Sequence, residues 1–292
     1  MLSRIFRPSQ GTHSRNERFF DPPSKRAFPR TDFDRKLVIM RFQVGFQTDI
    51  GRKRQQNQDN GAALPEQGVF IVADGMGGHR GGETASAIAV EVIPAVIQRE
   101  LSIGRNATES LATAIQTASR SIHAKASENP TLQGMGTTST VLLFQQDRLV
   151  IGHVGDSRAY LIRTEGIWQL TRDHSLVQEK LRAGLINRDQ VRSDRMKNVI
   201  TRSVGFERDV EVDTYEMKVR AGDRYLICSD GLSGLMEDHD LHRVIGTLRS
   251  ESNGLTPSQQ IVAELIKSAN QNGGDDNITA ILIEILPEGS AH

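Results

Sequence analysis

From Val38 onward, the chain alternates between short apolar runs and turns that are rich in glycine and aspartate. Seven of these runs have the length and the aliphatic and aromatic content of buried strands. They are Phe42–Phe46, Gly68–Ala73, Thr138–Phe144, Leu149–Val154, Ala159–Ile162, Arg224–Cys228 and Ile278–Ile285. The segment Gly152–Leu161 joins two of the runs closely, which predicts a tight hairpin.

Three other segments have the pattern of helices. Glu83–Gln98 is rich in alanine, valine and isoleucine, and we expect Pro94 to bend or end it. Asn106 resembles a helix N-cap and Thr256 begins a capping box, and apolar residues follow each at helical spacing. Because the strands cluster instead of alternating one for one with helices, we expect a single domain of largely antiparallel sheets with helices packed outside.

The N-terminal residues differ from the rest of the chain in charge. Residues 1–36 contain nine Lys/Arg and four Asp/Glu, whereas the whole chain has a net charge of zero. They show neither helical nor strand periodicity, so they are either a disordered extension or a basic, aromatic arm that docks on a partner or a membrane surface. We therefore predict a basic extension over 1–37, a globular domain over 38–287 and a short tail over 288–292.

Charge and cysteine content exclude several classes of protein. The mildly acidic remainder of the chain gives no support to a nucleic-acid groove. Cys228 is the only cysteine, so no intramolecular disulfide can form, which favours a reducing cytoplasm. No apolar run approaches the ~18–20 residues that span a bilayer, and the N-terminus lacks a signal-peptide core. These features predict a cytoplasmic protein without a transmembrane segment.

Carboxylates stand at the ends of several predicted strands. Asp74, Asp156 and Asp230 each follow an apolar run, and Asp276 directly precedes one. A carboxylate at the tip of a buried strand is unfavourable unless a positive charge neutralises it. Oxygen ligands of this kind select Mg²⁺, Mn²⁺ or Ca²⁺, so the pattern predicts that these residues converge on a metal centre.

The glycine-rich stretch after Asp74, from Gly75 to Gly82, raises the alternative of a phosphate-binding loop. A P-loop ends in Gly-Lys-Ser/Thr, which is absent here, and a carboxylate directly before the glycine would repel a pyrophosphate. Glycine beside the carboxylate allows a backbone carbonyl to approach the same cation. We interpret the stretch as a metal-binding loop.

Seven motifs then follow one another along the chain. They are Arg54 with Asn57-Gln58-Asp59, Asp74-Gly75-Met76-Gly77-Gly78-His79, Gly136-Thr137-Thr138, Val154-Gly155-Asp156-Ser157-Arg158, Asp173-His174-Ser175, Ser229-Asp230-Gly231-Leu232 and Asp276-Asn277-Ile278-Thr279. Their order and spacing resemble the metal-dependent protein serine/threonine phosphatases of type 2C, the PPM family, in their bacterial form. The resemblance extends from about Gly45 to Ile285. It implies an α+β fold, a four-layer αββα sandwich whose two central antiparallel β-sheets are flanked by helix pairs.

The same resemblance assigns roles to individual residues. It implies a site for two Mn²⁺ or Mg²⁺ ions that Asp74 bridges, with the Gly75 carbonyl, Asp230 and Asp276 as further ligands. Asp59 would hold a metal-bound water, and Asp156 would bind a weaker third ion. His153 replaces the asparagine of the family's Asn-Val-Gly-Asp pattern, which puts the geometry of that third site in question.

The implied activity is the hydrolysis of phosphoserine and phosphothreonine by direct attack of a metal-bridging hydroxide. Arg54 would grip the substrate phosphate, because the guanidinium fork matches phosphate oxygens. His79 is our candidate for the general acid that protonates the leaving group, although it could also simply cap a turn. Implied partners are phosphorylated Ser/Thr proteins and a cognate Ser/Thr kinase, and we expect a monomer.

Several alternatives were weighed against this interpretation. A catalytically silent domain that binds phosphorylated proteins would be favoured by missing ligands, yet the expected aspartates are all present. Cys228 lacks the arginine that a cysteine phosphatase requires six residues later, so we expect it in the core. His174 is expected to pin a loop by hydrogen bonds, and His174–Gly205 resembles the variable flap of the family.

Overall fold

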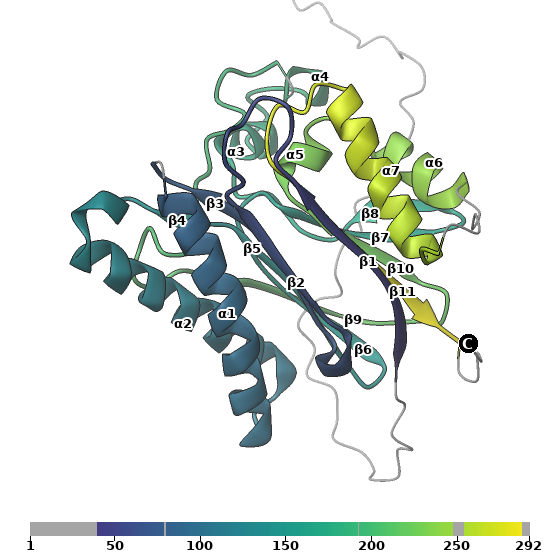
Figure 1. Ribbon diagram of the computed structural model, residues 1–292, viewed down its shortest axis with the longest axis horizontal. Helices are drawn as coiled ribbons and strands as arrows, with labels where there is room; N and C mark the ends of the chain where they lie inside the picture. Colours follow the sequence, from purple (N-terminus) through teal and green to yellow (C-terminus); the bar gives the residue numbers. More distant parts are fainter. Residues whose placement is uncertain (1–39, 79, 192, 248–253, 288–292) are drawn as a thin grey trace, which may run out of the picture.

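The computed structural model describes residues 40–78, 80–191, 193–247 and 254–287, and its strands form two antiparallel sheets (Figure 1). The five-stranded sheet has the order β1-β11-β10-β7-β8: β1 (Arg41–Asp49), β11 (Ile278–Leu286), β10 (Arg224–Cys228), β7 (Arg158–Arg163) and β8 (Gly166–Gln169). The six-stranded sheet has the order β2-β3-β5-β6-β9, with β4 paired to β3: β2 (Asp59–Leu64), β3 (Val69–Met76), β5 (Ser139–Gln145), β6 (Arg148–Val154), β9 (Asp213–Lys218) and β4 (Gly136–Thr137). The predicted extension and tail lie outside the described residues.

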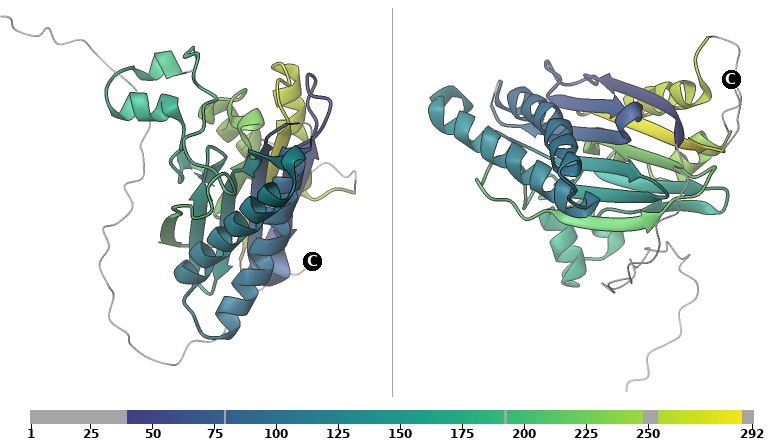
Figure 2. Two further views of the ribbon diagram at one scale, coloured as in Figure 1. Left: turned by 90° about the vertical axis from the view of Figure 1, so that its left-hand side faces the viewer. Right: turned by 90° about the horizontal axis from the view of Figure 1, so that it is seen from below.

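Helices cover the outer face of each sheet. In Figures 1 and 2, α1 (Gly81–Ser102) and α2 (Ala107–Glu128) lie on the six-stranded sheet, and α6 (Asp238–Thr247) and α7 (Pro257–Gln271) lie on the five-stranded sheet. The short helices α3 (Leu176–Arg182), α4 (Arg188–Val191) and α5 (Asp230–Ser233) lie at one end of the sandwich, and Pro65–Gln67 and Pro130–Leu132 form single 3₁₀ turns. The predicted αββα sandwich is confirmed. None of the described helices is long and apolar enough to cross a membrane.

Three apolar clusters hold the four layers together. One lies between the sheets, and its aromatic members Phe42, Phe70, Phe144 and Tyr225 form pairs with ring centroids 5.1 to 5.7 Å apart. Such pairs contribute about 0.5–1.5 kcal/mol each beyond their buried area. The other two clusters join each sheet to its helix pair. Both faces of each sheet are therefore buried, and polar side chains gather at the sheet ends.

The helix signals in the sequence have their expected geometry. The Asn106 side chain accepts a hydrogen bond from the Glu109 N–H at 2.8 Å, and Thr256 and Gln259 form a complete capping box. Pro94 does not end its helix, because α1 continues to Ser102. Ile93, Val96 and Ile97 around it are buried in the cluster beneath α1, so packing outweighs the hydrogen bond that proline removes.

The predicted hairpin at Gly152–Leu161 is wrong. β6 pairs with β5 and β9 in one sheet, whereas β7 pairs with β10 and β8 in the other. The turn after Val154 therefore carries the chain from the six-stranded to the five-stranded sheet. Both strands are almost fully buried, and each pairs with two strands other than its neighbour across the turn. A local turn pattern does not reveal which sheet each strand joins.

Candidate functional site

Five aspartates that are far apart in sequence approach one end of the sandwich. Asp59 and Asp74 are directly paired in the register of β2 and β3. Asp230 follows β10 and Asp276 precedes β11, and these two strands pair through Cys228 and Ala280. Strand pairing therefore brings two carboxylates together in each sheet, and Asp156 joins them from the turn after β6.

Contacts between the sheets join these pairs into one site. The Ser229 hydroxyl donates to Asp59 Oδ2 at 2.8 Å, which ties the end of β10 to the start of β2. Arg54 Nη2 donates to Asp276 Oδ2 at 2.5 Å, so the loop before β2 touches the start of β11. The structure thus brings Arg54 to the carboxylates, which is the condition under which it becomes a candidate phosphate ligand.

Burial and mutual repulsion perturb these carboxyl groups. Burial raises the pKa of Asp59 to about 7, and the charges of Asp230 and Asp276 add to the rise against hydrogen bonds from Thr279 and Ser229. Burial, followed by the charges of Asp59 and Asp230, raises the pKa of Asp74 well above its usual range. The pKa of Asp230 is likewise raised by burial and then by Asp276. Ionised together, these groups need a compensating positive charge.

Several carboxylate oxygens in the site have no hydrogen-bond donor. Among the described residues, Asp59 Oδ1, Asp156 Oδ1 and Asp230 Oδ1 are buried and without a partner. A buried carboxylate oxygen without a donor is strongly unfavourable, and a hard cation is the partner that such oxygens suit. The donor set therefore fits Mn²⁺ or Mg²⁺.

The carboxylates do not yet close around a cation. No group of three or more His, Cys, Asp or Glu residues within the described ranges has the geometry of a finished metal site. Two of the side chains are directed to other partners, since Asp276 faces Arg54 and Asp59 bonds Ser229. The unpartnered oxygens of Asp59, Asp156 and Asp230 remain the feature of the site that suits a cation.

The main chain at Asp74 and Gly75 is held by hydrogen bonds and by close packing against α1. The Asp74 N–H donates to Thr138 Oγ1 and the Thr137 hydroxyl donates to the Asp74 carbonyl, both at 2.9 Å. A Cβ at Gly75 would lie 2.1 Å from the carbonyl oxygen of Gly82, at the start of α1. Glycine is therefore required at position 75, and the threonines fix the main chain that presents Asp74. His79 lies outside the described residues.

Asn277 is a site residue to which the sequence motif gave no role. Its Oδ1 accepts from the Gln58 N–H at 2.8 Å, and its Nδ2 donates to the carbonyls of Ile50 and Gln56 at 3.0 and 2.9 Å. These three bonds hold the loop that carries Arg54. The position of Asn277, directly after Asp276 in the same motif, was the only sign in the sequence that it belongs to the site.

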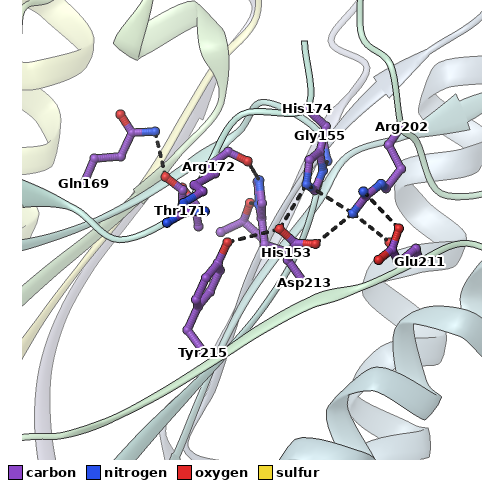
Figure 3. A network of polar contacts seen from close by, with 11 residues as sticks. His153, Gly155, Gln169, Thr171, Arg172, His174, Arg202, Glu211, Asp213 and Tyr215 are labelled. Atoms are coloured by element: carbon purple, nitrogen blue, oxygen red, sulfur yellow. Dashed lines mark hydrogen bonds and ion pairs between the residues drawn. The ribbon is translucent and has the colours of Figure 1, made fainter. Parts of the chain in front are cut away.

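The remaining predictions concern three single residues. His174 is buried and accepts a hydrogen bond from the Gly155 N–H, as expected of a residue that pins a loop. His153 is also buried. One ring nitrogen bonds the Thr140 hydroxyl, and the other bonds the Arg172 carbonyl (Figure 3). Cys228 is a core residue, and burial raises the pKa of its thiol to about 12, which excludes a reactive thiolate.

The family model described as Protein phosphatase 2C matches residues 48–283. The chain belongs to the protein phosphatase 2C family. This phosphatase is 37% identical over 244 residues to the serine/threonine phosphatase stp of Listeria innocua, which covers 82% of this chain and 94% of the relative. The predicted membership and enzyme class are thereby confirmed.

Solved structures agree with this assignment. The serine/threonine phosphatase PstP/Ppp of Mycobacterium tuberculosis superposes with a TM-score of 0.76 at 31% identity, over 84% of this chain and 99% of that chain. The PstP catalytic domain in complex with two manganese ions gives a TM-score of 0.74 at 31% identity, over 84% of this phosphatase and 99% of that chain.

Proposed function

We propose that this phosphatase removes phosphate from phosphoserine and phosphothreonine in proteins, and that it uses two divalent metal ions for direct hydrolysis without a covalent phosphoenzyme. The observation that carries the proposal is the convergence of five aspartates on one end of the sandwich, three of which have a buried oxygen without a hydrogen-bond partner. A catalytically silent domain that binds phosphoproteins would not need to keep several mutually repelling carboxylates buried together, so this alternative is not favoured.

In this proposal the aspartates hold the metals. Asp74, Asp230 and Asp276 bind two Mn²⁺ or Mg²⁺ ions together with the Gly75 carbonyl, Asp59 acts through a water molecule, and Asp156 binds a weaker third ion. When bound, such ions supply an activated water near neutral pH and offset charge on the phosphoryl oxygens. The manganese complex of the similar PstP catalytic domain supports Mn²⁺ as one of the ions used.

Arg54 is the proposed ligand of the substrate phosphate. Its side chain is about half exposed (52%), and its guanidinium lies beside the carboxylates on a loop held by Asn277. Cations bound at Asp276 would neutralise the carboxylate that Arg54 now contacts, which leaves the guanidinium fork for the substrate phosphate. His79 remains our proposed general acid, on its motif alone.

The proposal extends to the cellular setting. We assign the protein to signal transduction in the cytoplasm, acting as a monomer on the targets of a cognate Ser/Thr kinase. The single buried cysteine fits a reducing compartment, and phosphoserine or phosphothreonine substrates require a kinase that makes them.

Metal removal tests the proposal directly. The full chain is dialysed against a chelator, and p-nitrophenyl phosphate and a phosphothreonine peptide are then assayed before and after Mn²⁺ is restored. We expect hydrolysis to disappear on chelation and to return with Mn²⁺. Hydrolysis that persists after thorough chelation would exclude the metal-dependent mechanism.

A further inference from the structure

Asp156 is held in the site mainly through its main chain. It is 7% exposed, its Oδ1 has no hydrogen-bond partner, and burial followed by repulsion from Asp230 raises its pKa well above the usual range. Its carboxylate therefore has little side-chain support. The position of this group depends on the main chain on either side of it, at Gly155 and Ser157.

The main chain at Gly155 is tightly constrained. Gly155 has φ +108°, a conformation that residues with side chains rarely adopt, and a Cβ there would lie 2.6 Å from Thr138. On the other side, the Ser157 hydroxyl bonds Thr138 Oγ1 at 2.8 Å. Thr138 also accepts the Asp74 N–H, so the turn that carries Asp156 packs on the residue that fixes Asp74.

His174 holds Gly155 from both sides. The Gly155 N–H donates to His174 Nδ1 at 3.0 Å, and the N–H of His174 donates to the Gly155 carbonyl at 2.8 Å. The His174 carbonyl in turn accepts from Thr201 at 2.8 Å. His174 is 6% exposed, so these bonds are shielded from water.

The tautomer of His174 follows from these partners. A backbone N–H can only donate, so Nδ1 is the acceptor and the ring proton lies on Nε2. Nε2 then donates to Asp213 Oδ2 at 3.2 Å, as Figure 3 shows. Arg202 lies 3.2 Å from the same nitrogen, but it donates to Asp213 Oδ1 at 2.8 Å and to Glu211.

Asp213 is itself well anchored. Arg202 and the Tyr215 hydroxyl donate to it, and it is the first residue of β9. The hydrogen bond from His174 is the main cause that lowers the pKa of Asp213 below its usual range, so it is an ionised acceptor. The ring of His174 is thus held in one orientation with its acceptor nitrogen directed at Gly155 (Figure 3).

We propose that His174 is a positioning residue for Asp156: it clamps both main-chain polar groups of Gly155, and Asp213 fixes the tautomer that makes the clamp possible. Thr201, which bonds the His174 carbonyl, directly follows the 175–200 segment, and a bridge between Ser175 and Ile200 joins the ends of that segment, so its position is coupled to Asp156. The inference rests on the proposed function only in taking Asp156 as a metal ligand.

Two substitutions by amide side chains distinguish the roles of the two ring nitrogens of His174. In His174→Asn the amide oxygen can take the place of Nδ1 and still accept from Gly155. In His174→Gln the amide reaches the place of Nε2 and bonds Asp213, but no acceptor faces Gly155. His242→Gln is the matched control, because His242 lies on α6 and its Nε2 bonds the Arg163 carbonyl at 3.0 Å, at the end of β7 away from Asp156.

The full chain and its variants are compared by three measurements: direct Mn²⁺ binding by electron paramagnetic resonance, the Mn²⁺ concentration that half-activates p-nitrophenyl phosphate hydrolysis, and hydrogen exchange of the peptide containing Gly155. We expect His174→Gln to raise the half-activating concentration about 10–100-fold, the usual effect of losing a partner that orients a metal ligand. The same variant should speed exchange at Gly155. His174→Asn should restore most of both properties, and His242→Gln should change neither.

The outcomes separate this inference from the proposed function. Equal effects of His174→Asn and His174→Gln, or unchanged Mn²⁺ binding and exchange in His174→Gln, would overturn the positioning role. A wild-type chain that binds Mn²⁺ but hydrolyses no phosphate ester would overturn the proposed function, while binding and exchange would still decide the role of His174.

Discussion

The replacement of Asp59 by asparagine gives a sharp test of the electrostatics of the site. Asp59 is 4% exposed, and its pKa rises from 3.8 to about 7 in the folded protein. A raised carboxyl pKa means that ionisation opposes folding, so the wild-type stability falls as pH rises from about 4 to about 7. Asparagine does not ionise and keeps an oxygen that accepts from Ser229. Asp59→Asn should therefore lack the part of this fall that Asp59 causes.

The expected size follows from the same pKa. A rise from 3.8 to about 7 corresponds to at most about 4 kcal/mol, at about 1.4 kcal/mol for each tenfold change in the ionisation constant. In the presence of a chelator, Asp59→Asn should therefore be more stable than the wild type by up to about 4 kcal/mol at pH 8. The difference should shrink to below about 1 kcal/mol near pH 4, and it should vanish only at lower pH, where the wild-type carboxyl is protonated in both states.

Urea unfolding in chelator from pH 4 to pH 8 measures this difference, with Asp147→Asn as an exchange of the same kind at a position outside the site. Saturating Mn²⁺ should then reverse the order at pH 8, because the wild type gains the free energy of metal binding and the variant gains less. If Asp59→Asn is no more stable than the wild type at pH 8 without metal, the repulsion inferred from the structure is wrong.

Three further predictions concern single residues. Asp230→Asn should reduce turnover by more than the about 10–100-fold that orienting partners of metal ligands contribute, with unchanged circular dichroism; near-normal turnover would remove Asp230 from the ligand set. Asn277→Leu should destabilise the protein by about 3 kcal/mol, because it leaves one N–H and two carbonyls unpaired, and it should raise KM for phosphopeptides. The control is Asn272→Leu, which loses one bond to Leu235. Equal KM values in the two variants would contradict the role of Asn277. Gly75→Ala should lower the melting temperature and turnover together, because its Cβ would lie 2.1 Å from the Gly82 carbonyl oxygen; a melting temperature within error of the wild type would contradict the close approach.

Local features of the fold were determined by the sequence itself. Each predicted strand corresponds to an observed one, and the caps at Asn106 and Thr256 form as expected, because both depend on neighbours within a few residues. The strands β2, β4, β8 and β9 were not predicted. Asp59–Leu64 contains glycine and alanine in place of β-branched residues, and it becomes a strand only because β3 pairs with it.

The carboxylates at strand ends were also determined by the sequence, because a buried strand exposes its tips and polar residues collect there. Their order along the chain was enough to indicate the family. Tertiary structure alone decided how they meet: the pairing of β10 with β11 joins Asp230 to Asp276, and contacts between sheets add Asp59 and Arg54.

The turn after Val154 shows the limit of the sequence most clearly. Its pattern is that of a hairpin, yet β6 and β7 join different sheets, and the turn instead presents Asp156 at the site. Partners distant in sequence, including His174, Asp213 and Thr138, hold it there. Pairing between distant strands and burial of both faces are properties of the whole fold, so only the tertiary structure could decide where this aspartate lies.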